Sequence, residues 1–296
     1  MKEGIAKLKN ALASAECILI GAGAGLSAAA GYDYGGARFL KYFSDFHERF
    51  GIEDIYTGGF YPFPTRGLFW AWWSRSIYIN RYAPMSESDV YPNLLRLAAG
   101  RDYFVLTTNV DHAFQRTGFD KERLFYTQGD FGLFQSSRPA GASAGRTYDN
   151  EEQVRAMLRA QGFTFAPNGA LLLPEDGAPL MEVPAHLIPY CPDDGTEMTT
   201  NLRADEFFVE DAGWHAAAAR YEDWLARSEG RRMLLLELGV GANTPGIIKY
   251  PFWRMTAARA DVTLAVIHLG AYVPDEIRGR SIALDGHIEE VLRELL

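Results

Sequence analysis

The chain has 296 residues, of which 48% are apolar, and a formal net charge of −9 at pH 7. That apolar content can supply a core without disulfide support, and the two cysteines, Cys17 and Cys191, provide no disulfide framework. The acidic balance argues against a general binder of nucleic-acid backbones. No run approaches the roughly 20 consecutive apolar residues that a membrane span needs. We find no signal-peptide pattern in the first residues. We therefore expect a cytoplasmic protein without nucleic-acid or membrane partners.

The first elements predict a strand, turn and helix unit. Residues 3–15 alternate charged and apolar positions at helical spacing, and the apolar run 17–20 predicts a buried strand. Gly23, Gly25 and Ala28 then follow the G-x-G-x-x-G/A spacing, in which glycines permit a sharp turn and a close approach of the backbone to a ligand. Free N–H groups at the start of the next helix favour an anion such as a pyrophosphate. The alternative is a turn that only packs a helix on a sheet.

The next segment does not continue as a redox dinucleotide site would. Such a site places an acidic residue about 20 positions later, at the end of a second strand. Residues 41–48 are too aromatic and charged for a buried parallel strand, which weakens a hydride-transfer function. From 32 to 63 the chain is irregular and rich in Gly, Tyr and Phe, so we predict a mobile cofactor loop and then a small helical insertion. The run 68–82 predicts an aromatic helix, for which packing is favoured over acceptor binding.

Five apolar runs end in polar or glycine-rich residues. After the first run, the others are 103–107, which follows a predicted helix over 91–99, then 123–126, 233–238 and 262–267. The residues that follow them are 108–111, 127–130, 239–244 and 268–270. Open parallel sheets bind ligands at the carboxyl ends of their strands. The pattern therefore predicts an α/β fold with a doubly wound, mostly parallel, Rossmann-like sheet that binds a nucleotide.

A smaller inserted module is predicted where the pattern changes, between 131 and 215. Short apolar fragments at 171–173 and 186–190 predict strands there, and helices over 212–227 and 285–296 lead back to the core and close it. Cys191 begins half of a zinc-knuckle pattern, but structural zinc needs four ligands, so no zinc is expected. We divide the chain into a core of 1–35, 91–135 and 216–296, a cofactor loop with a helical insertion over 36–90, and a small module over 136–215.

Four motifs, at 23–31, 107–111, 128–129 and 239–244, together resemble the sirtuin family in order and spacing. The resemblance covers nearly the whole predicted core. It implies NAD, consumed as a substrate through cleavage of its nicotinamide glycosidic bond rather than used as a redox carrier.

Three departures from the usual sirtuin pattern indicate a branch of that family. Gln128 stands where most sirtuins carry a histidine general base, and an amide cannot accept a proton at neutral pH, so deacetylation by the usual route is not expected. Residues 32–39 replace the usual Pro-Asp-Phe-Arg, so Arg38 can stand in for the phosphate-side arginine only with a rearranged loop. Of the four zinc cysteines only Cys191 remains. The chain thus resembles the class M sirtuins, encoded beside macrodomain genes, which implies protein mono-ADP-ribosylation of a lipoylated glycine-cleavage-H-like carrier, with a macrodomain protein as a further partner.

The resemblance implies three catalytic residues. Asn109 would orient the ribose and the incoming nucleophile, Asp111 would fix Asn109 or the nicotinamide amide, and Gln128 would hydrogen-bond the ribose hydroxyls without taking their proton. Two alternatives stay open: Asn109 caps a helix that starts near Val110, and Gln128 is a surface amide at a strand end. The residues implied to bind NAD are Gly23, Ala24, Gly25, Ser27, Asp33, Arg38, Phe39, Asn109, Asp111, Gln128, Gly239, Val240, Asn243, Thr244 and His268.

Three further polar residues are weighed against structural roles. His268 is implied at the adenosine ribose, with a hydrogen-bonded scaffold role as its alternative. His112 is expected to start a helix and point away from Asp111, because neighbours in a helix do not share a face. Arg203 is a candidate contact from the inserted module. The functions under consideration are a protein ADP-ribosyltransferase, a deacylase or NAD hydrolase, and a nucleotide-binding regulator without turnover.

Overall fold

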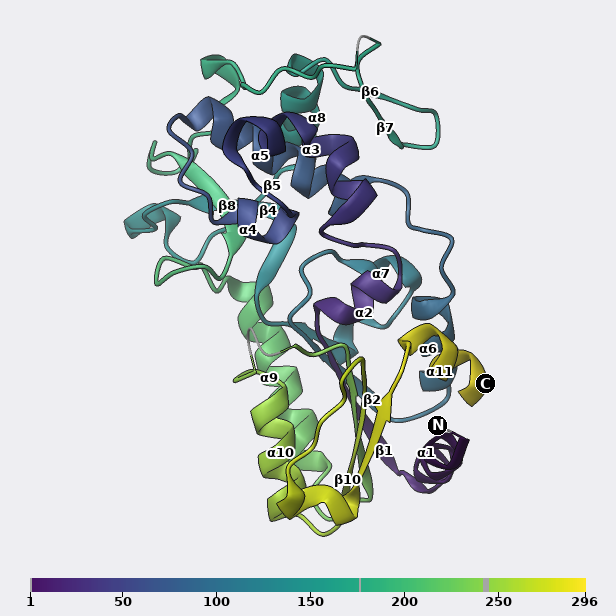
Figure 1. The fold of residues 1–296 in the computed structure, drawn as a ribbon. Helices are drawn as coiled ribbons and strands as arrows, with labels where there is room; N and C mark the ends of the chain where they lie inside the picture. Colours follow the sequence, from purple (N-terminus) through teal and green to yellow (C-terminus); the bar gives the residue numbers. More distant parts are fainter. Residues whose placement is uncertain (1, 176, 242–244) are drawn as a thin grey trace. The chain divides into compact units, whose positions relative to one another are not determined.

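The computed structural model describes residues 2–175, 177–241 and 245–296, and the chain forms two compact units (Figure 1). Unit 1 consists of Met1–Gly31, Glu87–Gln128 and Gly213–Leu296. Unit 2 consists of Tyr32–Ser86 and Gly129–Ala212. No described helix combines the length and the apolar character that crossing a membrane would require.

Unit 1 is built on a parallel sheet of six strands in the order β11-β10-β9-β1-β2-β3. The strands are β1 (Cys17–Ala22), β2 (Tyr103–Thr107), β3 (Leu124–Tyr126), β9 (Met233–Leu238), β10 (Val262–His268) and β11 (Ser281–Asp285). All five apolar runs therefore form strands of one sheet, and the predicted doubly wound, mostly parallel α/β fold is confirmed. The sixth strand, β11, was not predicted.

The register of this sheet brings the carboxyl ends of its central strands level. Ala22 pairs with Thr107 on one side and with Leu238 on the other. Every residue of β1, β2 and β9 is buried, because helices cover both faces, and this explains why the runs are continuously apolar rather than alternating. The loops that follow these strands therefore start together at one edge of unit 1.

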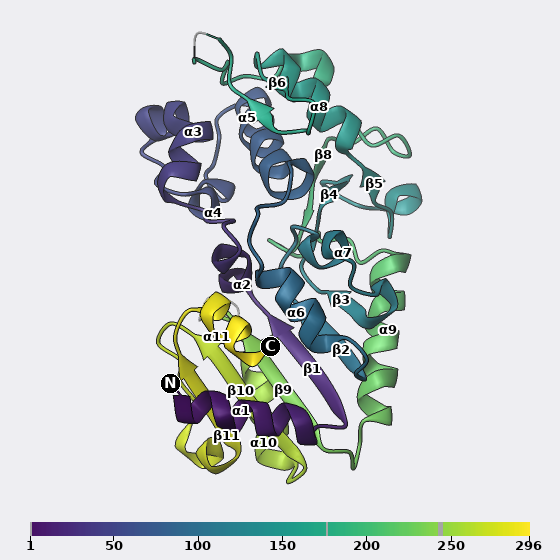
Figure 2. The same ribbon diagram turned by 90° about the vertical axis from the view of Figure 1, so that its right-hand side faces the viewer.

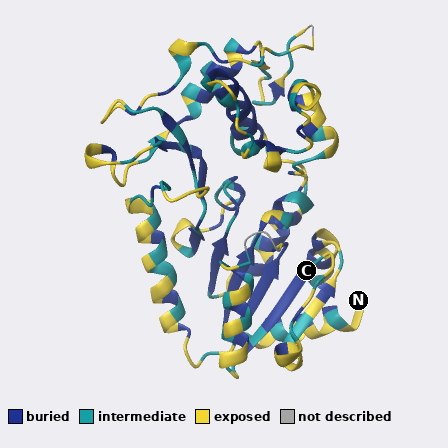
Figure 3. Cartoon of the chain, turned by 60° about the vertical axis from the view of Figure 1, so that its left-hand side comes forward, coloured by how far each residue is buried: buried dark blue, intermediate teal, exposed yellow. Residues whose placement is uncertain are grey.

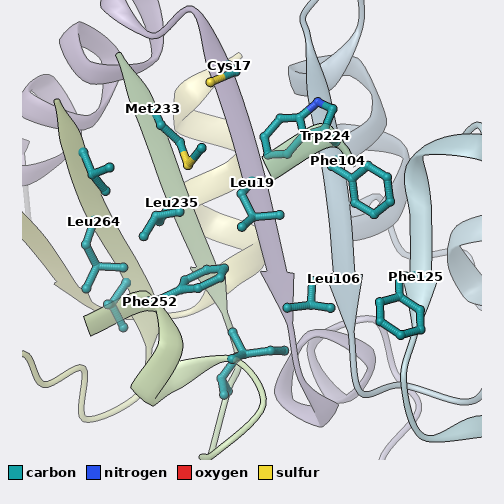
Figure 4. Close-up of a cluster of buried hydrophobic side chains, with 14 of the residues drawn as sticks. Cys17, Leu19, Phe104, Leu106, Phe125, Trp224, Met233, Leu235, Phe252 and Leu264 are labelled. Carbon is teal, nitrogen blue, oxygen red and sulfur yellow. The ribbon is translucent and has the colours of Figure 1, made fainter. Parts of the chain in front are cut away.

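Helices cover both faces of the unit 1 sheet. On one face, α9 and α10 contribute Trp224 and Phe252 to a buried cluster with Leu19 and Leu235 (Figure 4). On the other, α1, α6 and α11 lie together (Figure 2). Figure 3 shows the central strands as buried and α9 as largely exposed or intermediate along its length. The helices are α1 (Lys2–Ser14), α2 (Ala24–Ala29), α6 (Val90–Ala98), α7 (Ala113–Thr117), η2 (Lys121–Arg123), α9 (Ala212–Arg227), α10 (Lys249–Ala258), η5 (Asp275–Arg280) and α11 (Ile288–Leu295).

Unit 2 combines a helical part with two small antiparallel sheets. Its helices are α3 (Gly36–Phe50), α4 (Ile55–Gly59), α5 (Arg66–Ile77), the π-helical turn η1 (Tyr78–Tyr82), η3 (Gly141–Ser143), α8 (Glu151–Ala160) and η4 (Ala185–Leu187). Its strands are β4 (Gly129–Ser136), β5 (Tyr148–Asp149), β6 (Thr164–Phe165), β7 (Leu171–Leu172) and β8 (Met198–Leu202). One sheet has the order β5-β4-β8, and the other pairs β6 with β7.

Residues 32–63, predicted as a cofactor loop followed by a small helical insertion, are largely helical, so the helical part is confirmed but begins already at Gly36. Phe39, Phe43 and Phe46 recur at helical spacing and form the buried face of α3. The helix ends at Gly51, whose φ of +66° is a left-handed conformation that glycine adopts without strain. The abundance of aromatic and charged residues hid this 3.6-residue period.

The predicted aromatic helix is α5, and its rings pack within unit 2. Trp70 and Trp72 are fully buried. The Trp72 ring centroid lies 4.4 Å from that of Phe43 and 5.1 Å from that of Phe46, and the Trp70 centroid lies 4.7 Å from that of Phe134. These contacts support the packing alternative over acceptor binding.

Two other element predictions need correction, and one strand was not predicted. The fragment 186–190 is not a strand, since η4 covers its first residues and Tyr190 forms only an isolated bridge to Glu197. The closing helix starts at Ile288 rather than 285, because Asp285 ends β11. The chain after Gln128 enters the antiparallel strand β4, which was not predicted.

Candidate functional site

Three glycines bring the turn after β1 against the end of β9. The Gly25 N–H donates to the Gly239 carbonyl at 2.9 Å. A Cβ added at Gly23 would lie 2.7 Å from the Gly239 oxygen, and one at Gly25 would lie 2.8 Å from it. Gly239 itself has a φ of +60°, and its Cβ would meet the Leu26 nitrogen at 2.3 Å. Only glycine fits these positions, so the motif builds a backbone-lined turn at the strand ends.

Four buried polar side chains form one hydrogen-bonded cluster beside this turn: Ser27, Tyr91, Asn109 and Asp111. Ser27 Oγ donates to Asp111 Oδ2 at 2.5 Å and accepts from Asn109 Nδ2 at 3.0 Å. The Tyr91 hydroxyl lies 2.8 Å from Ser27 Oγ. Because the one Ser27 proton is directed to the carboxylate, Tyr91 is the donor in that contact.

This cluster sets the orientation of the Asn109 amide. Asn109 Nδ2 also donates to the Gly23 carbonyl at 3.0 Å, and its backbone N–H donates to Thr107 Oγ1 at 3.0 Å. A carbonyl can only accept, so the NH2 group must face Gly23 and Ser27. Asn109 Oδ1 then points elsewhere and receives no hydrogen bond from another described residue. The amide therefore presents a fixed acceptor that a ligand hydroxyl can use.

The alternative role of Asn109 as a helix cap is not observed. Helix α7 begins at Ala113, three residues later than expected, with His112 as its N-cap residue. The Ala113 N–H donates instead to Asp111 Oδ1 at 2.9 Å. His112 adopts a φ of +64°, so it stands at the turn into the helix rather than within its first turn. Asp111 thus links Ser27 to the start of α7.

The other predicted positions in unit 1 lie at the same strand ends. Ala24 is exposed at the start of α2, Val240 is 4% exposed after β9, and His268 is the half-buried last residue of β10. Asn243 and Thr244 lie outside the described residues, so their predicted roles stay predictions.

Gln128 lies in the turn that follows β3 and is half-buried. Its side-chain amide makes no hydrogen bond to another described residue, whereas the preceding Thr127 accepts one from the Trp214 indole at 3.2 Å. Because β2 and β3 are adjacent and parallel, Asn109 and Gln128 follow neighbouring strand ends. The structure shows these amides at comparable positions in the sheet, and their roles toward NAD stay predictions.

The predicted residues in unit 2 are held by contacts within that unit. The Arg38 guanidinium donates to the Asp33 carbonyl at 3.0 Å, to the Ile79 carbonyl at 2.9 Å and to Asn80 Oδ1 at 2.9 Å. Burial lowers the pKa of Arg38. Phe39 is 1% exposed, and its ring stacks on Phe43 with centroids 5.8 Å apart. Arg38 therefore ties the start of α3 to the π-helical turn η1.

Arg203 also finds its contacts inside unit 2. Its guanidinium forms an ion pair with Glu210 at 2.5 Å and lies 4.4 Å from the centre of the Phe208 ring.

Cys191 shows no sign of a metal site. It is buried, and its sulfur lies 3.2 Å from the Tyr148 hydroxyl. Over residues 2–175, 177–241 and 245–296, no three His, Cys, Asp or Glu side chains gather as metal ligands would. The expected absence of zinc stays a prediction.

Tyr91 is the member of the cluster that the sequence did not single out. It sits on the buried face of α6 with 1% exposure, between apolar positions that predicted only packing. A buried tyrosine hydroxyl needs a hydrogen-bond partner, and this was the available signal. The partner itself, Ser27, lies 64 positions earlier in the chain.

Comparison with solved structures identifies the fold. A structure described as Sir2 bound to acetylated peptide superposes with a TM-score of 0.59 at 16% sequence identity, over 98% of this chain and 96% of that one. A Sir2 homologue in complex with NAD gives a TM-score of 0.58 at 14% identity, over 98% and 91%. At such identities the likeness shows the fold alone, and that fold is the sirtuin fold.

Curated relatives identify the family, although no family model matches the chain. A protein of Fusarium oxysporum f. sp. cubense, named as a probable bifunctional ADP-ribose hydrolase/ADP-ribosyltransferase, is 31% identical over 96% of this chain, which spans only 46% of that longer protein. A protein ADP-ribosyltransferase of Staphylococcus aureus is 33% identical over 98% of this chain and 86% of its own length. The chain therefore belongs to the family of the Staphylococcus aureus protein ADP-ribosyltransferase and has the sirtuin fold.

Proposed function

We propose that the chain is an NAD-dependent protein mono-ADP-ribosyltransferase that releases nicotinamide. The observation that carries this proposal is the Asn109 amide, which the buried cluster holds at the strand ends with its carbonyl oxygen unbonded by the described residues. The names of the curated relatives support ADP-ribosyl transfer, and solved sirtuin structures with NAD or ADP-ribose support NAD as the substrate.

The side chains at the strand ends suit a reaction that needs geometry more than acid or base strength. Cleavage of NAD at its nicotinamide bond generates an electrophilic ribose, which a preorganised set of dipoles stabilises. Asn109 orients a ribose hydroxyl or the incoming nucleophile through Oδ1, and the Ser27 and Asp111 contacts prevent its amide from rotating. The backbone-lined turn at Gly23 and Gly25 accommodates the pyrophosphate.

Gln128 distinguishes transfer from deacylation in this proposal. Its half-buried amide can donate and accept hydrogen bonds but cannot take up a proton at neutral pH. A hydroxyl of the bound ribose would therefore be held without being activated as a nucleophile against an acyl group. Attack on the ribose by a side chain of the acceptor protein remains available.

As the acceptor we propose a lipoylated carrier protein of the glycine-cleavage-H type. We further propose that the chain works in the cytoplasm together with a macrodomain protein, as class M sirtuins do. The Fusarium relative supports such a link, because its name pairs an ADP-ribose hydrolase with an ADP-ribosyltransferase in one longer chain. A hydrolase that removes ADP-ribose from the modified protein would reverse the transfer reaction, so the two activities together make the modification reversible.

The test is intact-protein mass spectrometry after incubation with NAD, a lipoylated carrier protein and, separately, an acetylated peptide. We expect the carrier to gain one ADP-ribose while the peptide stays unchanged, and Asn109→Ala to abolish nicotinamide release with its circular dichroism spectrum intact. Peptide deacylation, or free ADP-ribose with no modified protein, would replace the transferase with the deacylase or hydrolase. Intact NAD would indicate a regulator without turnover.

Substitution at Gln128 separates the two chemistries. Gln128→His tests whether the amide alone prevents deacylation, and Gln115→His is the matched control, since Gln115 is a half-buried amide on α7 of the same unit. Deacylation gained only by Gln128→His would assign the switch to that position. No gain of deacylation in either variant would mean that residues other than Gln128, where the acceptor binds, also prevent deacylation.

A further inference from the structure

A buried ion pair joins the end of strand β9 to the start of helix α10, the next described helix along the chain. Glu237 on β9 is fully buried, and its Oε1 accepts a hydrogen bond from the Lys249 ammonium, at the first residue of α10. The Lys249 side chain is 16% exposed, and its ammonium lies 5.8 Å from the centre of the Trp253 ring. The two residues are 12 positions apart in the sequence.

Glu237 is an unusual residue for its position. It lies in a central parallel strand, paired with Gly21 on β1 and with Val266 on β10, where the neighbouring strand residues are apolar. Its second carboxylate oxygen, Oε2, has no hydrogen-bond partner within the described part of the chain. Burial raises the pKa of Glu237, against the opposing effects of Lys249 and, more weakly, of His268. Exchange of a buried ion pair for apolar residues of similar volume is often neutral or stabilising, so the stability of the sheet does not by itself require a carboxylate here.

The space beside Glu237 is arranged to receive the start of α10. A Cβ added to Gly21 would lie 2.5 Å from Ile248 Cγ2 and 2.6 Å from the Phe252 ring. The missing side chain at Gly21 therefore lets the first turn of α10 pack directly on β1, with Lys249 within reach of Glu237. Packing and charge together fix the end of β9 and the start of α10 relative to each other.

Gly239 and Val240, the first residues after β9, lie against the glycine turn after β1. Gly239 accepts a hydrogen bond from the Gly25 N–H, and the Val240 Cα would be 2.9 Å from a Cβ on Gly23. A shift of Gly239 by a few tenths of an ångström would therefore move the turn that is expected to face the pyrophosphate. A site that holds its ligand by preorganised backbone contacts is sensitive to such displacements, since a misplacement of about 1 Å can cost roughly a hundredfold.

We propose that Glu237 and Lys249 act as a positioning pair for NAD, fixing the end of β9 against the start of α10 so that Gly239 and Val240 support the pyrophosphate turn. This inference rests on the proposed NAD-dependent function. The pair does not take part in bond cleavage. Its loss lowers the affinity of the site for NAD and leaves the turnover of the saturated enzyme close to wild type.

The variants separate positioning from stability. Glu237→Leu/Lys249→Met replaces the pair with apolar residues of similar size, an exchange that commonly preserves or raises stability. Lys249→Arg keeps the pair and serves as the conservative variant, and Glu237→Gln serves as a second disruption if the double variant does not fold. Arg259→Gln/Asp261→Asn is the matched control, because it removes an ion pair of 2.7 Å at the other end of α10.

The readouts are KM for NAD and kcat from nicotinamide release, with Kd for ADP-ribose from calorimetry as a readout independent of turnover. We expect the Leu/Met variant or Glu237→Gln to raise KM for NAD and Kd for ADP-ribose about tenfold while kcat changes less than twofold. Lys249→Arg and the Arg259/Asp261 control are expected near wild type.

Each outcome has a distinct meaning. If wild type binds ADP-ribose and consumes NAD but the folded Leu/Met variant or Glu237→Gln matches it in both constants, the positioning role is refuted. If kcat falls and KM does not, the pair serves chemistry and the inference is equally wrong. If wild type neither binds ADP-ribose nor releases nicotinamide, the proposed function itself fails.

Discussion

Replacement of Gly239 by alanine tests the backbone arrangement at the strand ends. The added Cβ would lie 2.3 Å from the Leu26 nitrogen and 2.4 Å from the Gly25 carbonyl carbon, whereas van der Waals contact needs about 3.5 Å. Both neighbours are backbone atoms, so no side-chain rotation can relieve the overlap. The left-handed conformation adds about 1–2 kcal/mol for alanine, and overpacking typically costs about 1–3 kcal/mol.

We therefore expect Gly239→Ala to lower the free energy of unfolding by about 2–5 kcal/mol and to raise KM for NAD at a temperature where the variant is folded. The measurements are urea unfolding followed by circular dichroism and nicotinamide release at varied NAD. Gly241→Ala is the matched control two residues later, because its Cβ meets no described atom within 4 Å and Gly241 is not among the glycines with positive φ. If the two variants agree within about 0.5 kcal/mol and share one KM, the close approach does not support the site.

Three further substitutions address the cluster, unit 2 and the pH dependence of stability. Tyr91→Phe removes a buried donor, so we expect a loss of about 1 kcal/mol in urea unfolding and a lower kcat with KM for NAD retained; an unchanged kcat would contradict a role in orienting the amide. Arg75 is fully buried and bonded to Asp45 at 2.8 Å, so Arg75→Met should cost about 3 kcal/mol or more by the same method, and a cost below about 1 kcal/mol would refute its importance. Burial opposes ionisation of Asp102, but hydrogen bonds from the Trp224 indole and an arginine lower the pKa of Asp102 below its ordinary 3.8. Its contribution to stability is therefore present above pH 3.8 and lost as the pH falls through the lower folded value, so Asp102→Asn should show a flatter acid limb than wild type, and parallel limbs would exclude the linkage.

The parallel sheet was accessible from sequence because its strands are buried on both faces. Runs such as 17–20 and 233–238 need no alternation to be recognised, and glycine-rich or polar residues after each run indicate where the ligand edge lies. Gly23 and Gly25 were assigned from the spacing of the glycine turn, whereas Ser27, Asn109 and Asp111 were assigned through the resemblance to sirtuins. The carboxyl ends of adjacent parallel strands meet at one edge whatever the rest of the chain does.

Regions whose packing comes from nonlocal contacts were harder to predict. The bounds of helix α3 were not predicted, because its aromatic residues are those of a packed helix face only in contact with Trp72 of α5. The strands β4 and β8 pair with each other across more than sixty positions, so neither carries a strong local signal.

The amino-acid sequence by itself determined the α/β class, the glycine turn and the residue types at the strand ends, since these follow from local periodicity and from the conformational freedom of glycine. Tertiary structure alone decided how those residues act. The direction of the Asn109 amide depends on Gly23 and Ser27, more than 80 positions away, and the ion pair of Glu237 depends on where α10 packs. The partners of hydrogen bonds and buried charges depend on which groups are close together in the folded chain, and the separation of two residues in the sequence does not give that distance.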